Sequence, residues 1–332
     1  MKIFLTGGTG SFGQCFVKKA LADSAVESIT VYSRDEMKQW ELAQRLSSPK
    51  LRWIIGDVRD KDRLSDSVRG HDMVVHAAAT KIVPTAEINP EECIKTNVIG
   101  AMNLVSACLA NNVFKCVALS TDKASNPVNL YGASKLASDK IFVAANAVHE
   151  NLVSSSATKF VVVRYGNVLA SRGSVIPFFV NLAKAGSAIP ITDPRMTRFV
   201  ITLGEAVEFV FLALEKSCGG EIFVPKLPSV KILDLVEAIA PKLQRQIIGV
   251  RPGEKLHEQM ISSDESLWTA EYDAYYKILP SSFPKLAELA ATDGQKVPEA
   301  FSYTSDINDV WMDSDSVRVW IHQNLGVELP IQ

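Results

Sequence analysis

The first thirteen residues limit the fold of this chain more than any other stretch. Lys2–Thr6 has the composition of a buried strand, and Gly7-Gly-Thr-Gly-Ser-Phe-Gly13 follows it directly, ahead of an apolar pattern with helical spacing. A strand, a tight glycine turn and a helix N-terminus offer free backbone N–H groups and a positive dipole end to a pyrophosphate. Glycine turns also arise for steric reasons alone, but this context predicts a dinucleotide site built from Gly7, Thr9, Gly10, Ser11, Phe12 and Gly13.

The end of the second predicted strand, Ser28–Tyr32, bears on which dinucleotide binds. A carboxylate at this position holds a ribose 2′-hydroxyl, whereas a cation accommodates a 2′-phosphate. Here Ser33 and Arg34 follow the strand, and Lys38 comes four residues after Arg34. The pattern favours NADP over NAD, although a solvated loop of mixed charge would have the same composition.

Two more predicted strands end beside the expected cofactor. The strand at 51–57 places Asp57 and Val58 where an adenine ring would lie, although an aspartate there is also a common helix cap. The strand at 72–79 ends in small residues, so a cofactor can lie against the backbone at Ala77.

Two polar side chains near the end of this fourth strand have different expected roles. His76 is predicted to be a buried core histidine rather than a catalyst. Lys81 follows the strand, where it can reach cofactor or substrate or be an ordinary loop lysine; both interpretations stay open.

Strands and helices alternate along most of the chain. Further apolar segments at 115–120, 159–166 and 221–225 are predicted strands, with helices such as 98–110 and 203–215 between them. Near-continuous apolar strands that alternate with helices are typical of a parallel sheet covered on both faces. We therefore expect an α/β protein with a Rossmann-type, doubly wound parallel sheet of about seven strands.

The pattern changes after about residue 167, where loop-rich, proline-punctuated and basic segments begin. This predicts an NADP-binding domain of residues 1–166 plus about 200–225, and an interleaved substrate lobe of about 167–199 plus 226–332. Within that lobe we expect Ser229 to cap a helix that runs to about Ala240. No element is assigned to most of the tail beyond 263.

The stretch from Ser120 to Lys135 concentrates reactive groups at a strand end and the next helix start. Tyr131 and Lys135 share one helical face, so the lysine charge can lower the pKa of the tyrosine and favour proton removal from a substrate alcohol. Thr121 can hydrogen-bond the same oxygen while hydride moves to a nicotinamide. These three side chains predict an alcohol oxidation.

Asp122 and Lys123 add a second acid–base pair that simple oxidation does not need. Once C4 of a sugar is a ketone, a neutral Lys123 can remove the C5 proton and a protonated Asp122 can protonate the departing 6-hydroxyl. The pair therefore suits an elimination. A surface ion pair or a helix cap is the alternative interpretation.

Composition excludes several classes of function. The net charge is −2, so no overall field recruits nucleic acid or an anionic membrane surface. The five cysteines show no Cys-x-x-Cys and no metal-ligand spacing with histidines, which predicts reduced thiols and no metal site. We see neither a leader segment before Gly7 nor an apolar run near the roughly 18 residues of a membrane helix. We expect a cytoplasmic protein.

These motifs together closely resemble the extended short-chain dehydrogenase/reductase family. Within it, the chain is similar along nearly its whole length to the nucleotide-sugar 4,6-dehydratases that act on UDP-N-acetylglucosamine. Besides the glycine turn and the 120–135 stretch, four segments carry the resemblance: His76–Lys81, Arg164–Asn167, Arg172–Pro177 and Arg251–Glu258.

Two positions narrow the resemblance. The dTDP-glucose 4,6-dehydratases carry Asp-Glu where this chain has Asp122-Lys123, and the membrane-anchored, C5-retaining relatives carry methionine where it has Tyr131. The chain is therefore most similar to the soluble, C5-inverting enzymes that begin pseudaminic acid synthesis for flagellin glycosylation.

The resemblance implies a role for each site residue. Asp122 is the acid, Lys123 the base, and Tyr131 with Lys135 serves the 4-hydroxyl and the cofactor. Arginines would hold the diphosphate of the UDP-sugar, and Glu254 a ribose hydroxyl. The implied substrate residues are Lys81, Asn167, Val175, Thr192, Met196, Arg198, Arg251 and Glu254. The resemblance also suggests a homo-oligomer, with a hexamer as one arrangement.

Two other functions stay open at this point. A C4 epimerase acting on the same sugar nucleotide would need Tyr131 and Lys135 but would leave Asp122 and Lys123 unused. A non-catalytic NADP-sensing module would need neither the tyrosine nor the arginines on the UDP side.

Overall fold

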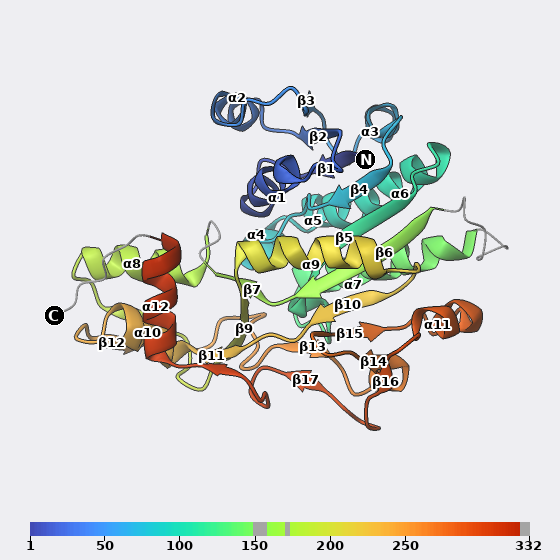
Figure 1. Ribbon diagram of the computed structural model, residues 1–332. Helices are drawn as coiled ribbons and strands as arrows, with labels where there is room; N and C mark the ends of the chain where they lie inside the picture. The colour runs from blue at the N-terminus through green and yellow to red at the C-terminus, as the bar shows by residue number, and fades with distance from the viewer. Residues whose placement is uncertain (149–157, 170–172, 326–332) are drawn as a thin grey trace.

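Ten strands form the central sheet of the computed structural model, which describes residues 1–148, 158–169 and 173–325 (Figure 1). Seven of them run parallel in the order β3-β2-β1-β4-β5-β6-β10. The doubly wound α/β sheet is confirmed, and the strand order reverses beside β1, where such sheets bind ligands. The bounds are β1 (Lys2–Thr6), β2 (Ser28–Ser33), β3 (Leu51–Ile55), β4 (Met73–His76), β5 (Lys115–Thr121), β6 (Lys159–Tyr165) and β10 (Ile222–Pro225).

Helices cover both faces of this sheet, which explains why its central strands are apolar on both sides. On one face α1 (Ser11–Ala22) packs on α9 (Leu203–Lys216). On the other, α6 (Gly100–Ala110) lies between α3 (Lys61–Val68) and α7 (Leu130–Ala145). Between the two helical layers, Phe160 to Val163 of β6 are fully buried.

The tail adds three antiparallel strands to the parallel sheet. β15 (Tyr275–Ile278) pairs with β10, and β14 (Thr269–Glu271) and β16 (Gln295–Lys296) continue the sheet outward. The predicted sheet of about seven strands is therefore extended to ten. These short strands have no helical or alternating pattern that would predict them from the sequence. They form because β15 pairs with the edge of β10 and the other two strands follow.

A second apolar core is formed in part by α8 (Val175–Lys184), α10 (Ile232–Ile239) and α12 (Ser314–Leu325). Two small sheets contribute to it. The larger has four strands in the order β18-β11-β9-β7, and the smaller has two. Their bounds are β7 (Asn167–Val168), β9 (Thr197–Ile201), β11 (Ser229–Lys231) and β18 (Trp311–Met312), beside the pair β8 (Ile189–Ile191) and β12 (Arg245–Ile247).

The helix predicted to begin at Ser229 begins later. Ser229 lies in β11, where it pairs with Phe199 and its backbone N–H donates to the carbonyl of Val310. The helix α10 starts at Ile232 instead. Tertiary pairing with β9 overrides the local capping signal of the serine.

The remaining elements are short. The strands β13 (Gln259–Ile261) and β17 (Tyr303–Thr304) pair with each other and bring the tail against the 251–258 loop. The short helices are α2 (Glu36–Arg45), α4 (Val83–Ile88), α5 (Pro90–Ile94) and α11 (Pro284–Ala290).

Among the residues that the structure describes, one helix is long and apolar enough to cross a membrane by length and composition. It runs from Pro90 to Ala110, because α5, a π-helical turn at Lys95–Ile99 and α6 are continuous. The sequence pattern predicted a helix only at 98–110, which is too short to cross a membrane, because the turn at Lys95–Ile99 was not expected to be helical. Half of its most apolar stretch is buried within the fold, where α6 packs on α3 and α7.

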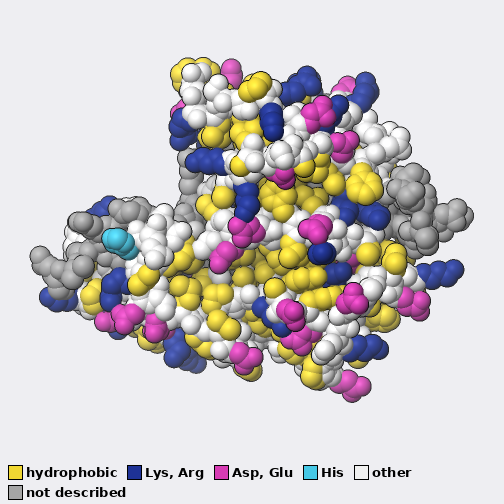
Figure 2. Space-filling view, viewed as in Figure 1, with side chains coloured by type: hydrophobic (Ala, Val, Ile, Leu, Met, Phe, Trp, Pro, Cys, Tyr) yellow, Lys and Arg dark blue, Asp and Glu magenta, His cyan; other side chains and the backbone are white. Residues whose placement is uncertain are grey.

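In Figure 2, lysine, arginine, aspartate and glutamate side chains of both signs lie interspersed, mostly around a broad hydrophobic area in the middle of this face. This distribution agrees with the small net charge of −2.

Candidate active site

Two adjoining cavities lie where the carboxyl ends of the parallel strands meet the smaller core. The larger has a volume of about 850 Å³ and is lined by the glycine turn, the ends of β2, β4 and β5, and the start of α7. The second, of about 640 Å³, lies between α8 and the 251–254 loop. Both are lined by Asn167, Val175, Arg198 and Arg251, so together they form one elongated site.

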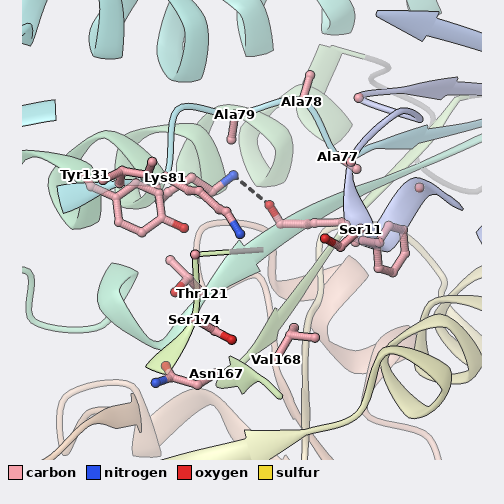
Figure 3. Close-up of a pocket in the computed structure, with 18 of the residues that line it drawn as sticks. Ser11, Ala77, Ala78, Ala79, Lys81, Thr121, Tyr131, Asn167, Val168 and Ser174 are labelled. Atoms are coloured by element: carbon pink, nitrogen blue, oxygen red, sulfur yellow. Dashed lines mark hydrogen bonds between the residues drawn. The ribbon is translucent and has the colours of Figure 1, made fainter. Parts of the chain in front are cut away.

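All of the predicted cofactor residues line the larger cavity. They are Gly7, Thr9, Gly10, Ser11, Phe12, Gly13, Ser33, Arg34, Lys38, Asp57, Val58, Ala77, Lys81, Tyr131 and Lys135. Figure 3 shows Ser11 and Ala77 at one end of this space and Tyr131, Thr121 and Asn167 at the other. The sequence therefore located both ends of the cavity.

The glycine turn fits a dinucleotide because its backbone is packed too tightly for side chains. Gly7 has a φ of +68°, and a Cβ there would lie 2.7 Å from the carbonyl of Ala77. A Cβ on Gly13 would lie 2.5 Å from the carbonyl oxygen of Gly8. The first turn of α1 thus faces the cavity with its N–H groups close to where a pyrophosphate would lie.

Opposite charges are paired at the end of β2. Arg34 Nη1 lies 3.7 Å from Asp57 Oδ2, and Lys38 Nζ lies 2.7 Å from Asp35. The buried Gln39 side chain donates to Ser33 Oγ at 2.9 Å and to the carbonyl of Ile54 at 2.9 Å. Ser33 is thereby held in place, while Arg34 and Lys38 remain half-exposed at the cavity rim.

Local capping fixes the conformation of the Ser120–Lys135 stretch. Thr121 ends β5, and its hydroxyl accepts from the N–H of Lys123, which closes a single 3₁₀ turn at Asp122–Ala124. Asn129 accepts from the N–H of Gly132 at 2.7 Å and so starts α7 with Tyr131 in its first turn. These caps bring the side chains predicted from the 120–135 stretch together.

Asp122 and Lys123 form an ion pair, and a third residue that sequence analysis did not single out completes it. Lys123 Nζ lies 3.1 Å from Asp122 Oδ1, 3.1 Å from Glu258 Oε1 and 3.3 Å from Asn167 Oδ1. Thr121 Oγ1 also donates to Asp122 Oδ1, at 2.8 Å. Both carboxylates are buried, whereas the Lys123 side chain keeps 24% of its surface exposed. Only Lys123 of the three lines the larger cavity, among the residues described.

Burial and charge shift the pKa values of this cluster in different directions. Burial raises the pKa of Asp122. The charge of Lys123 lowers it in part, and the charge of Glu258 raises it further. Burial alone would lower the pKa of Lys123, but the two carboxylates outweigh it and raise the pKa. Burial would raise the pKa of Glu258, yet Lys123 and Arg198 bring it below its ordinary value. Lys123 is therefore an ammonium in this state.

Tyr131 and Lys135 lie as predicted but differ in their electrostatics. Burial raises the pKa of Tyr131 to about 12, and the cation that counteracts this is Lys123. Lys135 is buried and donates to the carbonyl of Leu119 at 2.6 Å, and burial lowers its pKa. The lysine expected to activate the tyrosine is thus hydrogen-bonded to the backbone.

Buried charges behind Lys135 extend the site into the core. Asp139 accepts from Ser120 Oγ at 2.8 Å and lies 3.5 Å from Arg164 Nη2, while Arg164 Nη1 lies 3.1 Å from Glu265. Asp139 follows Lys135 by four residues, and this helical spacing was a signal available in the sequence. Arg164 belongs to a segment that carries the family resemblance, but its pairing with Asp139 had no local signal, and Glu265 of the tail had none at all.

Asn97 was also missed as a supporting residue. Its side chain accepts from the N–H of Thr80 at 2.8 Å and donates to the carbonyl of Thr80 at 2.9 Å and to Ser134 Oγ at 2.9 Å. It therefore ties the loop that carries Lys81 to the helix that carries Tyr131. Lys81 itself lines the larger cavity, and burial lowers its pKa.

The predicted substrate residues line the second cavity, the first or both. Thr192, Met196 and Glu254 belong to the second, and Asn167, Val175, Arg198 and Arg251 to both, whereas Lys81 lines only the first. Arg172, part of one motif, lies outside the described residues.

Arg198 is less available than the sequence suggests. Its Nη1 donates to the carbonyls of Thr197 and Leu256 at 2.7 and 3.0 Å, and its Nη2 to that of Lys255 at 3.2 Å. By contrast, Arg251 is half-exposed and lies 3.6 Å from Glu254. Arg251 therefore has more freedom than Arg198 to contact a bound anion.

This fold and this site define an extended short-chain dehydrogenase/reductase: a Rossmann sheet, a glycine turn, and Thr121, Tyr131 and Lys135 beside one cavity. A family model described as polysaccharide biosynthesis protein matches residues 3–280, and the chain belongs to that family. The family resemblance predicted from the sequence is confirmed.

Two curated relatives bear on the chemistry. A Campylobacter jejuni protein named UDP-N-acetylglucosamine 4,6-dehydratase (inverting) is 55% identical over 98% of both chains. A Rickettsia akari protein named UDP-glucose 4-epimerase is 42% identical over 83% of this chain and 82% of its own. The predicted resemblance to the inverting dehydratases is confirmed.

Solved structures agree with the fold. Pen from Bacillus thuringiensis is 32% identical with a TM-score of 0.86, covering 97% of this chain and 98% of its own. DesIV, a dTDP-glucose 4,6-dehydratase from Streptomyces venezuelae solved with NAD and TYD, superposes over 100% of both chains with a TM-score of 0.70. At 22% identity, DesIV supports the shared fold alone.

Proposed function

We propose that this chain is an NADP-dependent enzyme of the nucleotide-sugar 4,6-dehydratase class that acts on UDP-N-acetylglucosamine and inverts C5. The product would be UDP-2-acetamido-2,6-dideoxy-β-L-arabino-hex-4-ulose. The observation that carries the proposal is the Asp122–Lys123 ion pair at the cavity wall beside Tyr131, because oxidation alone does not require a second acid–base pair. The inverting relative at 55% identity supports the same assignment.

The first step is removal of hydrogen from C4. The bound dinucleotide supplies the hydride acceptor for C4 and later the hydride donor for C6. Tyr131, as the phenolate, would take the proton of the 4-hydroxyl, and Thr121 lies beside it at the cavity wall. Lys123 opposes the effect of burial on the pKa of Tyr131 and so eases this exchange.

The second step is loss of water across C5 and C6. Lys123 lines the cavity and takes the C5 proton, which the ketone at C4 makes acidic. Asp122 is fully buried, so its proton would pass to Thr121 Oγ1 while the hydroxyl of Thr121, a residue of the cavity wall, gives its own proton to the departing oxygen. The departing 6-hydroxyl then leaves as water.

The groups at the end of β2 support NADP as the resident dinucleotide. Ser33 and the half-exposed Arg34 and Lys38 offer a hydroxyl and two cations at the rim near the adenosine end. Asp57 and Asp35, which pair with these cations, would have to give them up in part to a 2′-phosphate. Comparing the dissociation constants of NADP and NAD tests this assignment.

The UDP moiety would lie in the second cavity. Arg251 and Arg198 would face the diphosphate, Glu254 a ribose hydroxyl, and Val175, Thr192 and Met196 would pack on the nucleoside. We assign the nucleotide-binding domain to 1–166 plus about 200–225 and the substrate lobe to about 167–199 plus 226–332, with β14, β15 and β16 of the second range extending the sheet of the nucleotide-binding domain. We also propose that the protein is a cytoplasmic homo-oligomer and that its reaction begins pseudaminic acid synthesis for flagellin glycosylation.

Incubation with UDP-N-acetylglucosamine in deuterated water tests the reaction directly. We expect a 4-keto-6-deoxy product that carries deuterium at C5 and the inverted configuration, identified by NMR and by a mass lower by one water. Formation of no such product would contradict the proposal.

A C4 epimerase is the second candidate, because relatives 42% identical carry that name. It would give a product of unchanged mass and would not require Lys123. The mass of the product therefore separates the two functions in one measurement.

A further inference from the structure

Glu258 occupies a place in the site that neither the sequence motifs nor the oxidation chemistry explains. Its side chain is 3% exposed, and Oε1 contacts Lys123 Nζ at 3.1 Å. The other oxygen, Oε2, is buried without a hydrogen-bond partner among the described residues. Keeping a carboxylate in such surroundings costs free energy unless its charge is used.

The tail holds this carboxylate in place. The N–H of Glu258 donates to Ser305 Oγ at 2.9 Å, and its carbonyl accepts from the N–H of Ser305 at 2.8 Å. Ser305 is fully buried and also contacts Thr197 Oγ1 at 2.7 Å, and Thr197 in turn contacts His257 Nδ1 at 2.8 Å. The backbone of residue 258 is therefore fixed by the tail, and its side chain lies against Lys123.

With Glu258 in place, each N–H group of the Lys123 ammonium has a hydrogen-bond acceptor. Its three N–H bonds match three acceptors, namely Asp122 Oδ1, Glu258 Oε1 and Asn167 Oδ1. An ammonium so arranged cannot remove a proton from carbon. It becomes a base only after one proton passes to a neighbour, and Asn167 cannot accept one.

We infer that Glu258 is a positioning residue of the elimination: it holds Lys123 against Asp122, so that one proton moving from Lys123 Nζ to Asp122 Oδ1 creates the base and the acid together. This inference rests on the proposed dehydratase function. The N–H bond breaks and an O–H bond forms, and the net charge of the three groups stays at −1. Glu258 remains the anion throughout.

The direction of the transfer follows from the two carboxylates. The pKa of Asp122 is raised by burial and by the charge of Glu258, whereas that of Glu258 is lowered by Lys123 and Arg198 despite its burial. Asp122 is therefore the stronger proton acceptor of the two. The other charged or titratable groups around the cluster are Arg198 from β9, Lys255 from the 251–258 loop and Tyr131 from α7.

Replacing Glu258 by glutamine tests the inference through the pH profile of kcat. The active state requires one proton shared between Asp122 and Lys123, so activity falls in acid when Asp122 is protonated beside the ammonium, and in base when Lys123 loses its proton. Removing the charge of Glu258 lowers both pKa values. We expect Glu258→Gln to move both limbs of the profile to lower pH by about one unit and to slow elimination about 10- to 100-fold.

Three comparisons make the outcome unambiguous. Glu258→Asp restores the charge and should return the profile toward the wild-type pH range. Glu271→Gln removes the charge of a carboxylate on β14 that pairs with Lys226, and should match the wild type. Trapping the sugar oxidised at C4 should show that this species accumulates in Glu258→Gln. A slower variant with unmoved limbs, or one with wild-type turnover, overturns the inference. Absence of 4-keto-6-deoxy product from the wild type would instead contradict the proposed function.

Discussion

Replacement of Lys123 by methionine and by arginine separates its chemical role from its structural role. Methionine removes the cation that lies 3.1 Å from each of two buried carboxylates. Arginine keeps a cation at this position but cannot be deprotonated to act as a base. Both variants should therefore lose elimination, by about 10²- to 10⁴-fold, which corresponds to roughly 3–5 kcal/mol of transition-state stabilisation.

Only the methionine variant should lose stability. Removing one partner of a buried ion pair costs about 3–5 kcal/mol, because the remaining charges are left uncompensated. Without the cation, the pKa values of Asp122 and Glu258 in the folded state should lie above their unfolded values. Carboxyl groups of this kind stabilise the fold below the unfolded pKa, and that contribution is lost as the pH rises. The deficit should be larger at pH 7 than at about pH 5.

The measurements are product formation by mass, and thermal unfolding at the two pH values. Lys123→Arg should unfold near the wild-type temperature, and Lys123→Met several degrees lower at pH 7. Wild-type turnover by Lys123→Arg would remove this residue from the role of base. Equal stability of the two variants would show that the cluster does not carry the charge interaction derived from its geometry.

Three further substitutions probe the rest of the site. Tyr131→Phe should retain the dinucleotide but slow C4 oxidation about 10²- to 10⁴-fold, so that no 4-keto sugar is trapped; accumulation of that sugar would exclude the tyrosine from this step. Gly13→Ala should lower the unfolding temperature and weaken dinucleotide binding, because its Cβ would lie 2.5 Å from the carbonyl oxygen of Gly8; a wild-type melting curve and affinity would be the contrary result. Arg34→Ala should weaken NADP about tenfold, near 1.4 kcal/mol, and leave NAD unchanged in a calorimetric titration; an equal loss for both would disprove a 2′-phosphate contact.

Local sequence patterns were sufficient for the nucleotide half of the molecule. The apolar runs at 2–6, 28–32 and 159–166 became parallel strands because hydrophobic periodicity and the glycine turn act within about twenty residues. The same holds for the 120–135 stretch, where the caps formed by Thr121 and Asn129 are local and place the predicted side chains beside one cavity. Strand pairing to a distant edge was not predictable in this way, so β14, β15 and β16 were missed.

By itself, the sequence determined the doubly wound fold, the glycine turn and the side chains that the 120–135 stretch brings to the cavity, since each depends on residue types at short spacing. Tertiary structure alone decided their protonation. The environment of Lys123 depends on Glu258, which is 135 positions away in the chain and is held there by Ser305 of the tail. Charge interactions act through space at a few ångströms, and a pattern of neighbouring residues cannot show which distant carboxylate the fold will bring within that range.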